Sequence, residues 1–296
     1  MTRAIAFLGT GLMGGPMVRR LLEAGFSVSV WNRDPAKAVP LAKNGAIIAA
    51  SAVQAIQDAD IIFTMLSDGK AVNSVLFDGG VAAALKAGAV VIDTSSIAPP
   101  IAREHAKRLH EMGIHYIDCP VSGGTVGAEA GTLALMAGGE EALIEELADV
   151  FAALGRVTHV GPSGAGQICK LANQQIVAIT IGAIAEAMML VEAGGANRGK
   201  FRDAIRGGFA ESRILDLHGK RMVERNFEPG GPSRLQLKDL DAVVAMAEKF
   251  SLKLPLTEDI RNEYQAFVDA GDGEKDHSGL LLYLERLNNH GNEEAQ

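Results

Sequence analysis

A lysine and an asparagine stand near the start of a long apolar stretch, residues 165–193. Lys170 and Asn173 are three residues apart, so on a helix their side chains leave from the same face. A cationic lysine is costly to bury unless it is paired, and lysines in such places are suited to proton transfer. Lys170 is therefore a candidate acid–base residue. The alternative is a lysine whose stem is buried while its head lies in water.

A second candidate, Ser122-Gly123-Gly124, comes shortly after a predicted strand at residues 115–118. Open α/β sheets bind ligands at the carboxyl ends of their strands. Two glycines and a serine offer backbone N–H groups and a hydroxyl to an anion, although a flexible turn would look the same. The same strand-end argument predicts that the nicotinamide half of a cofactor is faced by Met65, Leu66, Ser67 and Ser96.

The cofactor itself is suggested by Gly9-Thr10-Gly11-Leu12-Met13-Gly14, which lies between an apolar run at residues 4–8 and a helical pattern. Strand, glycine turn and helix in this order form the context of a dinucleotide-binding loop. Gly9 permits the turn, Gly11 lets the backbone approach a pyrophosphate, and Gly14 lets the helix pack close to the strand. The alternative is an ordinary glycine-rich turn.

The end of the next predicted strand bears on the choice of cofactor. In NAD-binding proteins an acidic residue about 20 residues past the glycines binds the ribose hydroxyl. Asn32 is neutral at this place and Arg33 follows it, and arginine suits a 2′-phosphate. This pattern favours NADP over NAD. Asp34 leaves NAD possible, because it would approach a ribose if the strand ended later.

Composition limits the class of protein. With 48% hydrophobic and 22% charged residues, the 296-residue chain suits a globular protein with a large core. A net charge of −8 argues against nucleic acid as a partner. Two cysteines and a start that runs directly into a core strand predict no disulfide framework, no signal peptide and a cytoplasmic location. Residues 176–191 come closest to a membrane span, but Gly182 and Glu186 interrupt them, so no membrane is expected.

The order of elements predicts two domains. Strands alternate with helices in the first half, which indicates a doubly wound, mostly parallel sheet of the α/β class. Among the helical segments is one predicted over residues 140–154. After a glycine-rich break the strand signals largely vanish. We therefore predict a Rossmann-type domain over residues 1–163 and an all-helical domain over 164–296. The second domain begins with a long apolar helix, whose bare faces suggest a homo-oligomer.

Taken together, these residues resemble the β-hydroxyacid dehydrogenase family over nearly the whole chain. The family includes 3-hydroxyisobutyrate dehydrogenases, tartronate semialdehyde reductases and glyoxylate/succinic semialdehyde reductases. The stretch from Ile205 to Asp216 is most like the tartronate semialdehyde branch. The resemblance is carried by the glycine loop, Asp118–Gly124, Gly131-Thr132-Leu133, Gly164-Ala165-Gly166, Lys170–Gln174, Lys238-Asp239-Leu240 and Asp276-His277-Ser278.

The resemblance implies a Rossmann domain followed by a helical one, and roles for single residues. Lys170 corresponds to the catalytic lysine, and Ser122, Gly123, Gly124 and Asn173 match the site of the substrate carboxylate. Ser96 matches a nicotinamide-side position. The family's helical domain supplies a pair, here Lys238 and Asp239, at the cofactor and the catalytic site; Asp239 would hold Lys170 or Lys238 in place. The expected reaction interconverts a short β-hydroxy acid and its semialdehyde, with Lys170 transferring the proton and a nicotinamide the hydride.

Two departures bear on the substrate. Many relatives have phenylalanine where this chain has Gly231, which predicts a more open pocket rim, and Ser67 stands where proline is frequent. Tartronate, succinic and methylmalonate semialdehydes, glyoxylate and sulfonated analogues all remain candidate substrates.

Other classes of protein fit the motifs less well. Lys170 argues against an imine reductase, and a 6-phosphogluconate dehydrogenase would have a longer helical domain. A non-catalytic NADP-binding sensor would not need Lys170, Asn173 and Ser122. Asp276-His277 is interpreted as the start of a helix rather than as a catalytic pair, and no cluster has the spacing of metal ligands.

Overall fold

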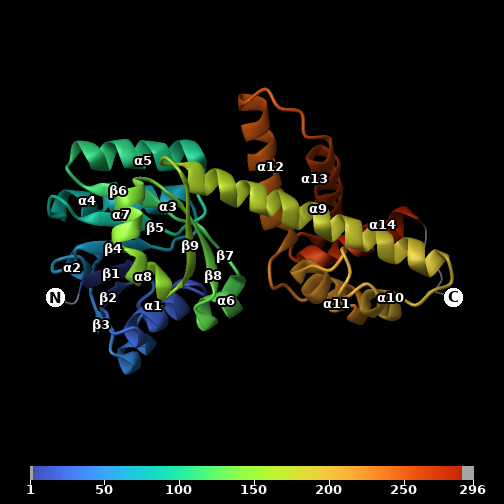
Figure 1. Cartoon of the computed structure of the whole chain (residues 1–296), viewed down its shortest axis with the longest axis horizontal. Coiled ribbons are helices and arrows are strands. Elements are labelled where there is room, and N and C mark those ends of the chain that lie inside the picture. Colours follow the sequence, from blue (N-terminus) through green and yellow to red (C-terminus); the bar gives the residue numbers. More distant parts are fainter. Residues whose placement is uncertain (1–2, 289–296) are drawn as a thin grey trace. The chain divides into compact units, whose positions relative to one another are not determined.

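The computed structural model describes residues 3–288, and these divide into two compact units between Lys170 and Leu171 (Figure 1). The division falls inside helix α9 (Ala165–Ala193), a few residues beyond the boundary predicted at residue 163. The reason is physical, because the start of α9 is hydrogen-bonded to Asp118 at the end of one strand of the first unit and to Ile97 in the loop after another.

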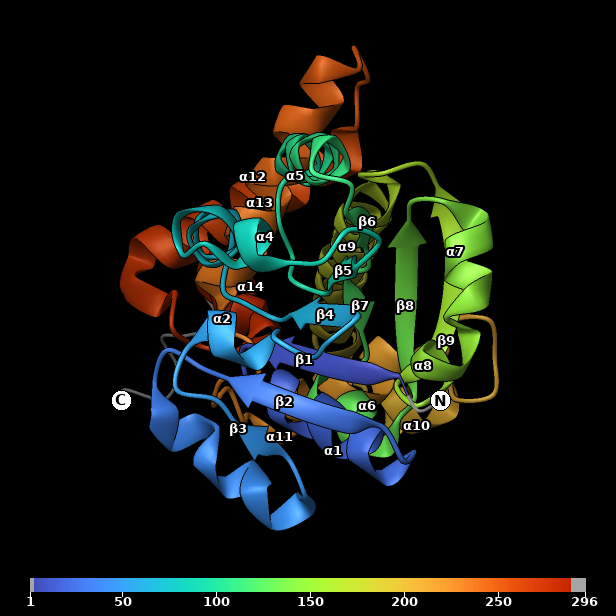
Figure 2. The same cartoon turned by 90° about the vertical axis from the view of Figure 1, so that its left-hand side faces the viewer.

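A nine-stranded sheet organises the first unit (Figure 2). The order is β3-β2-β1-β4-β5-β6-β8-β7, with β9 paired to β8. The six strands from β3 to β6 are parallel, whereas β8 runs antiparallel to β6 and β7. From β1 the chain continues to β2 and β3 on one side of the sheet, and then crosses over to β4 on the other side of β1. In open sheets, ligands bind at such a switch point. The strands are β1 Ala4–Leu8, β2 Ser27–Trp31, β3 Ile47–Ile48, β4 Ile61–Thr64, β5 Val90–Asp93, β6 His115–Asp118, β7 Val121–Ser122, β8 Leu133–Gly138 and β9 Gly155–Gly161.

Both faces of this sheet are covered, because side chains alternate along each strand. In β1, Ile5 and Phe7 belong to one buried cluster, while Ala6 and Leu8 belong to the other. The first cluster includes residues of α1, α6, α7 and α8, and the second includes residues of α4 and α5. The helices are α1 Gly14–Glu23, α2 Ala52–Ala55, α3 Gly69–Asn73, α4 Val81–Ala84, α5 Pro99–Glu111, α6 Gly124–Ala130, α7 Glu141–Glu146 and α8 Ala148–Ala152.

The single helix predicted over residues 140–154 is wrong in one respect. It is two short helices, α7 and α8, because Leu147 between them leaves the helical region of backbone space. By contrast, the long apolar helix begins and ends at the residues predicted from composition, Ala165 and Ala193.

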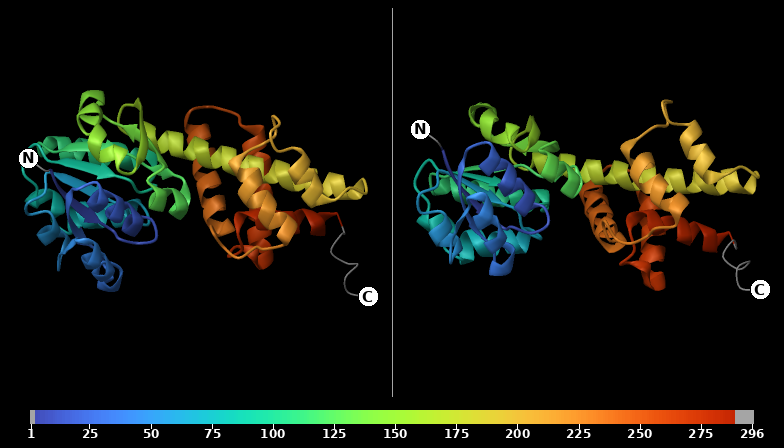
Figure 3. Two further views of the ribbon diagram at one scale, coloured as in Figure 1. Left: turned by 60° about the horizontal axis from the view of Figure 1, so that its bottom comes forward. Right: turned by 90° about the horizontal axis from the view of Figure 1, so that it is seen from below.

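The second unit is all-helical in the part of the chain described (Figure 3). Its core gathers around α9, where Ala178, Ile181, Ala185 and Met188 are buried. The other helices are α10 Arg198–Ala204, α11 Lys220–Glu224, α12 Ser233–Lys249, α13 Pro255–Phe267 and α14 Leu280–Leu287, with the short turn η6 His277–Gly279 before α14.

Helix α9 is long and apolar enough, by length and composition alone, to cross a membrane, so the expectation that no stretch reaches this limit is not met. Its buried residues form the core of the second unit, which is also what a core helix does. Only 28% of the residues in its most apolar 18-residue window are fully buried, and most of the others are half-buried.

Candidate functional site

The glycine turn follows β1 and has no room for side chains at two of its glycines. Gly9 adopts φ +107°, and a Cβ there would overlap the Met65 carbonyl. A Cβ on Gly14 would overlap the carbonyl of Gly9. A Cβ on Gly11 would meet nothing within 4 Å. The turn thus packs closely against the protein and is open over Gly11, which fits the pyrophosphate of a dinucleotide.

The end of β2 is joined to this turn. Asn32 follows the last residue of β2, accepts a hydrogen bond from the Thr10 N–H at 2.9 Å and donates one to the Asp34 carbonyl. The Asp34 carboxylate accepts from the Ala36 N–H and so begins a short helical turn, η1 (Pro35–Lys37). Asn32 therefore has a structural role that sequence reasoning missed, and Arg33 is exposed beside it.

The loops after β4 and β5 lie side by side, because Thr64 pairs with Asp93. The Leu66 N–H donates to the Ser95 hydroxyl at 2.9 Å. Ser67 and Ser96 are exposed. Beneath them Asp93 is fully buried, and burial raises the pKa of its carboxyl even though Thr64, Ser95 and Tyr116 donate hydrogen bonds to it.

Ser122 ends a separate short strand, β7, which the sequence did not predict. It is half-buried. Gly123 and Gly124 follow with φ +142° and +62°, conformations that favour glycine, and a Cβ on Gly123 would lie 3.1 Å from the Leu133 side chain. The loop therefore enters α6 through two glycine conformations that other residues rarely adopt.

Lys170 lies in the second turn of α9 and is half-buried. The turn before it contains Gln167 and is hydrogen-bonded to Asp118 and to the Ile97 N–H. Sequence reasoning singled out neither Asp118 nor Gln167 as a site residue. Burial raises the pKa of the Asp118 carboxyl to about 7, against the effect of the N–H groups of Gly164 and Gln167. In the sequence, Asp118 could be recognised only as a polar residue at the end of a predicted strand, and Gln167 only as a polar residue near the start of a predicted helix.

Asn173 and Asp239 are linked in the second unit by a residue that the sequence did not single out. The Asn173 amide donates to Gln174 Oε1 at 3.0 Å, and Gln174 Nε2 donates to Asp239 Oδ2 at 2.9 Å. Gln236 donates to the Gln174 carbonyl. Lys238 is exposed. Within this unit, the hydrogen bonds of Gln174 therefore connect α9 to the first two turns of α12.

The loop at Gly231 is packed against His277 on the side that a side chain would occupy, and the more open pocket rim stays a prediction. A Cβ there would lie 2.9 Å from the His277 ring, and the His277 N–H donates to the Gly231 carbonyl. Asp276 accepts hydrogen bonds from the N–H groups of Gly230 and Gly231. It also accepts from the Ser278 N–H at the start of η6, which confirms the prediction of a helix start.

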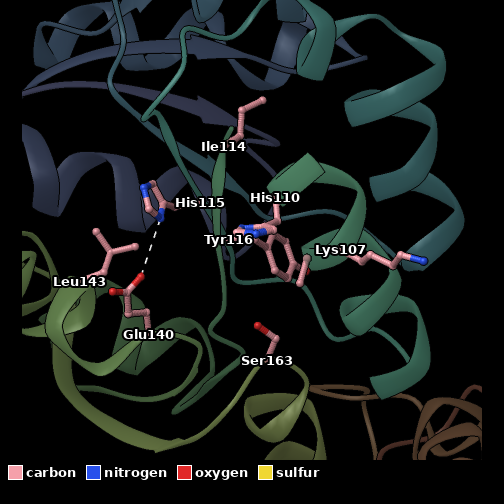
Figure 4. Close-up of a pocket in the computed structure, with 9 residues that line it drawn as sticks. Lys107, His110, Ile114, His115, Tyr116, Glu140, Leu143 and Ser163 are labelled. Atoms are coloured by element: carbon pink, nitrogen blue, oxygen red, sulfur yellow. Dashed lines mark ion pairs between the residues drawn. The ribbon is translucent and has the colours of Figure 1, made fainter. Parts of the chain in front are cut away.

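A cavity of about 300 Å³ lies elsewhere in the first unit (Figure 4). It is at the beginning of β6, where His115 forms an ion pair with Glu140 at 3.9 Å. None of the predicted site residues lines it. Among residues 3–288, no group of three or more His, Cys, Asp or Glu side chains could hold a metal ion.

The comparisons with known proteins agree with this architecture. A family model described as the NAD binding domain of 6-phosphogluconate dehydrogenase matches residues 4–161. A second, described as NAD-binding of NADP-dependent 3-hydroxyisobutyrate dehydrogenase, matches residues 164–284. A parallel sheet with a glycine turn at its switch point, followed by this helical unit, defines a nicotinamide-dependent oxidoreductase.

Individual relatives narrow the class. The 2-hydroxy-3-oxopropionate reductase of Escherichia coli is 41% identical over 97% of this chain and 98% of its own. The NAD-dependent L-serine dehydrogenase of Pseudomonas aeruginosa is 33% identical over 93% of this chain and 96% of its own. The structure of Mycobacterium tuberculosis 3-hydroxyisobutyrate dehydrogenase with L-serine has a TM-score of 0.87 at 32% identity, covering 96% and 99% of the two chains. That of Psf3 with NADP+ and 2-OPP has a TM-score of 0.83 at 26% identity, covering 95% and 99%.

The chain belongs to the β-hydroxyacid dehydrogenase family. It is a nicotinamide-dependent dehydrogenase or reductase that acts on a CH–OH group.

Proposed function

We propose that the protein is an NADP-dependent reductase of a short aldehyde acid, with 2-hydroxy-3-oxopropionate (tartronate semialdehyde) as the substrate. The observation that carries the proposal is the 41% identity to the Escherichia coli enzyme of that name along almost the full length of both chains. A 3-hydroxyisobutyrate dehydrogenase is the second candidate, favoured by the similarity to the Mycobacterium tuberculosis structure.

In the proposed mechanism, Lys170 as an ammonium donates a hydrogen bond to the aldehyde oxygen, stabilises the developing alkoxide and gives it a proton. The bound reduced nicotinamide supplies the hydride. Ser122 and the N–H groups of Gly123 and Gly124 hold the substrate carboxylate, and Asn173 leaves α9 from the same face as Lys170. In the reverse direction a neutral Lys170 takes the hydroxyl proton.

The residues proposed to hold the cofactor follow the strand ends of the first unit. The glycine turn from Gly9 to Gly14 takes the pyrophosphate, and Met65, Leu66, Ser67 and Ser96 flank the nicotinamide. From the second unit, Lys238 contributes to the cofactor and Asp239 to the substrate.

The preference for NADP rests on Arg33. Asn32 is engaged with Thr10, and Asp34 with Ala36, so exposed Arg33 is the group best able to meet a 2′-phosphate through its planar donors. NAD is the alternative, since one relative is named for it. Arg33→Ala should raise KM for NADPH by about tenfold while changing KM for NADH little. An equal effect on both cofactors would contradict the assignment.

The reaction is tested by initial rates of NADPH and NADH oxidation with tartronate, methylmalonate and succinic semialdehydes and glyoxylate. Lys170→Ala should lower kcat by about 10²-fold or more while NADPH binding survives. Lys107→Ala, at an exposed lysine of α5, is the matched control and should keep the wild-type rate. A near-normal kcat in Lys170→Ala would overturn its role. NADPH binding without turnover on any aldehyde acid would favour a sensor instead.

We also propose that a second copy of the chain covers the exposed side of α9. Ala172, Ile176, Ala183 and Leu190 are exposed and recur at a spacing that places them along one face of the helix. Ile176 and Leu190 are 63% and 75% exposed, and large apolar side chains on one helix face are typical of an interface. Glu186 is also exposed on this face, between Ala183 and Leu190, so the interface would include one carboxylate.

Light scattering after gel filtration tests this interface. Leu190→Glu should shift the protein toward the monomer, whereas Leu256→Glu, at a leucine 67% exposed on α13, should not. A monomeric wild-type protein at micromolar concentration would overturn the proposal, as would an unchanged assembly in Leu190→Glu. Binding of the wild type to lipid vesicles would point to a membrane instead.

A further inference from the structure

The start of α9 is held by one fully buried carboxylate. Asp118, the last residue of β6, has no solvent exposure. Its Oδ1 accepts a hydrogen bond from the Gly164 N–H at 2.6 Å, and its Oδ2 accepts one from the Gln167 N–H at 3.0 Å. These are N–H groups of a helix start, which lack partners inside the helix itself. Asp118 therefore caps α9 from a strand 46 residues earlier in the chain.

The side chain of Gln167 makes a second connection on the same turn. It is 1% exposed. Its Oε1 accepts from the Ile97 N–H at 3.0 Å, and its Nε2 donates to the Ser95 carbonyl at 2.8 Å. The Ser95 hydroxyl in turn accepts from the Leu66 N–H. The first turn of α9 is thus tied to the loop after β5 as well as to the end of β6.

Two glycines allow the helix to come this close to the strands. A Cβ on Gly166 would overlap the carbonyls of Met136 and Asp118. A Cβ on Gly138 would lie 2.7 Å from Asp118 Oδ1 and 2.8 Å from the Gly166 nitrogen. Because contacts on several sides surround the turn, it has little freedom to slide or rotate.

We propose that Asp118 and Gln167 are positioning residues for Lys170; the proposal rests on the acid–base role proposed above for that lysine. Lys170 is three residues beyond Gln167, on the same side of α9 and less than one turn away. Asp118 fixes the helix start against the end of β6. Gln167 fixes its rotation about the helix axis, because its two amide atoms bond to two different backbone groups. Together they set the direction in which the Lys170 side chain leaves the helix.

The expected effect of losing either connection is on turnover. A displacement of about 1 Å in a catalytic group can lower a rate by about 10²-fold even when the mutated residue is remote from the chemistry. The glycine turn after β1 makes none of these hydrogen bonds, so binding of the cofactor through its pyrophosphate should be much less affected. Gln167 also holds the loop that carries Ser96, so its loss acts on the nicotinamide side as well as on Lys170.

The test compares Asp118→Asn and Gln167→Ala with the wild type. Asparagine keeps the shape of the side chain but has one acceptor oxygen for two N–H groups. We expect kcat to fall by about tenfold or more in each variant, with KM for NADPH within about twofold. We expect one limb of the wild-type kcat–pH profile to be absent in Lys170→Ala. The same limb should shift in Asp118→Asn and in Gln167→Ala.

Gln175→Ala is the matched control. Gln175 is a half-buried glutamine of the same helix, and it donates a long-range hydrogen bond to Thr257 at 2.6 Å. Its loss should destabilise the protein about as much as the loss of Gln167 without lowering kcat.

The outcomes separate the two proposals. A fall in kcat for Asp118→Asn and Gln167→Ala but not for Gln175→Ala supports positioning. If Lys170→Ala abolishes turnover while both variants keep the wild-type kcat, positioning is overturned and the proposed function stands. If Lys170→Ala retains turnover, both fail. An equal loss of kcat in Gln175→Ala also overturns positioning, and should Asp118→Asn not fold, the Gln167 and Gln175 pair decides.

Discussion

Two buried carboxylates, one in each unit, perform the same local task and carry opposite electrostatics. Asp118 and Asp276 are 0% and 1% exposed, and each accepts backbone N–H groups at the start of a helix. Burial raises the pKa of the Asp118 carboxyl to about 7. Burial acts to raise the pKa of the Asp276 carboxyl as well, but hydrogen bonds from His218 and Ser278 outweigh burial, so the pKa is lowered.

The difference comes from the neighbours. The groups that hydrogen-bond to the Asp118 carboxylate are neutral backbone N–H groups, and the nearby Asp93 carboxyl disfavours its charge further. Asp276 lies 3.2 Å from His218 Nδ1 and 3.3 Å from Arg221 Nη1. The same cap is therefore easily protonated in the sheet unit and held ionised in the helical unit. Burial alone does not set a carboxyl pKa.

The largest expected effect is the loss of charge at Asp276. Asp276→Asn should lower the free energy of unfolding at pH 7 by about 3 kcal/mol, because Arg221 and His218 lose their buried partner. Urea unfolding followed by circular dichroism measures the change, and fluorescence of Trp31, the single tryptophan, follows the first unit separately. A loss no larger than that of Asp118→Asn at the same pH would remove the contrast between the two carboxylates.

The second prediction concerns pH. The folded pKa of Asp118 lies above the usual 3.8, so between about pH 4 and pH 7 the folded state binds more protons than the unfolded state. The contribution of Asp118 to stability therefore falls as pH rises through this window. The unfolding free energy of the wild type minus that of Asp118→Asn should decrease by about 1–2 kcal/mol from pH 5 to pH 7.

The histidines His105 and His277, whose burial lowers their pKa to about 4, titrate in the same window but occur in both proteins, so their effect cancels in this difference. For Asp276 the folded pKa is depressed, so its stabilisation is present above pH 3.8 and lost only at lower pH. A difference between wild type and Asp118→Asn that is flat from pH 5 to pH 7 would show that Asp118 is ionised throughout.

The smallest expected effect sharpens the account of Asp276. The Ser278 hydroxyl donates to Asp276 Oδ1 at 2.6 Å. Ser278→Ala should cost about 1.5 kcal/mol, the value of a hydrogen bond to a charged group, and should raise the pKa of Asp276. Stability measured from pH 2 to pH 5 reports both changes. If the acid limb does not move, His218, Arg221 and the backbone N–H groups around Asp276 hold the carboxylate ionised without the Ser278 hydroxyl.

Sequence patterns predicted the elements whose signals are local. The glycine turn was readable because strand, turn and helix follow one another, and the structure gives Gly9 and Gly14 no space for a side chain. Composition alone placed both ends of α9. The interruption at Leu147 and the short strand β7 were missed, because both depend on local backbone geometry and pairing with no periodicity to reveal them.

The roles of Asn32, Gln174 and Gln167 were hidden for a different reason. Their partners lie 22, 65 and 70 residues away in the chain. Each is an ordinary polar residue until the fold brings a backbone group or a carboxylate to it.

The sequence by itself determined the family, the order of sheet and helical units and the set of residues proposed for chemistry, because these follow from glycine spacing, apolar periodicity and motif order. Only the tertiary structure decided which polar groups meet. It placed Asp118 under the start of α9 among uncharged donors, and Asp276 beside a histidine and an arginine. A carboxyl pKa depends on the charges and donors within a few ångströms, and in a folded chain most of these come from distant segments.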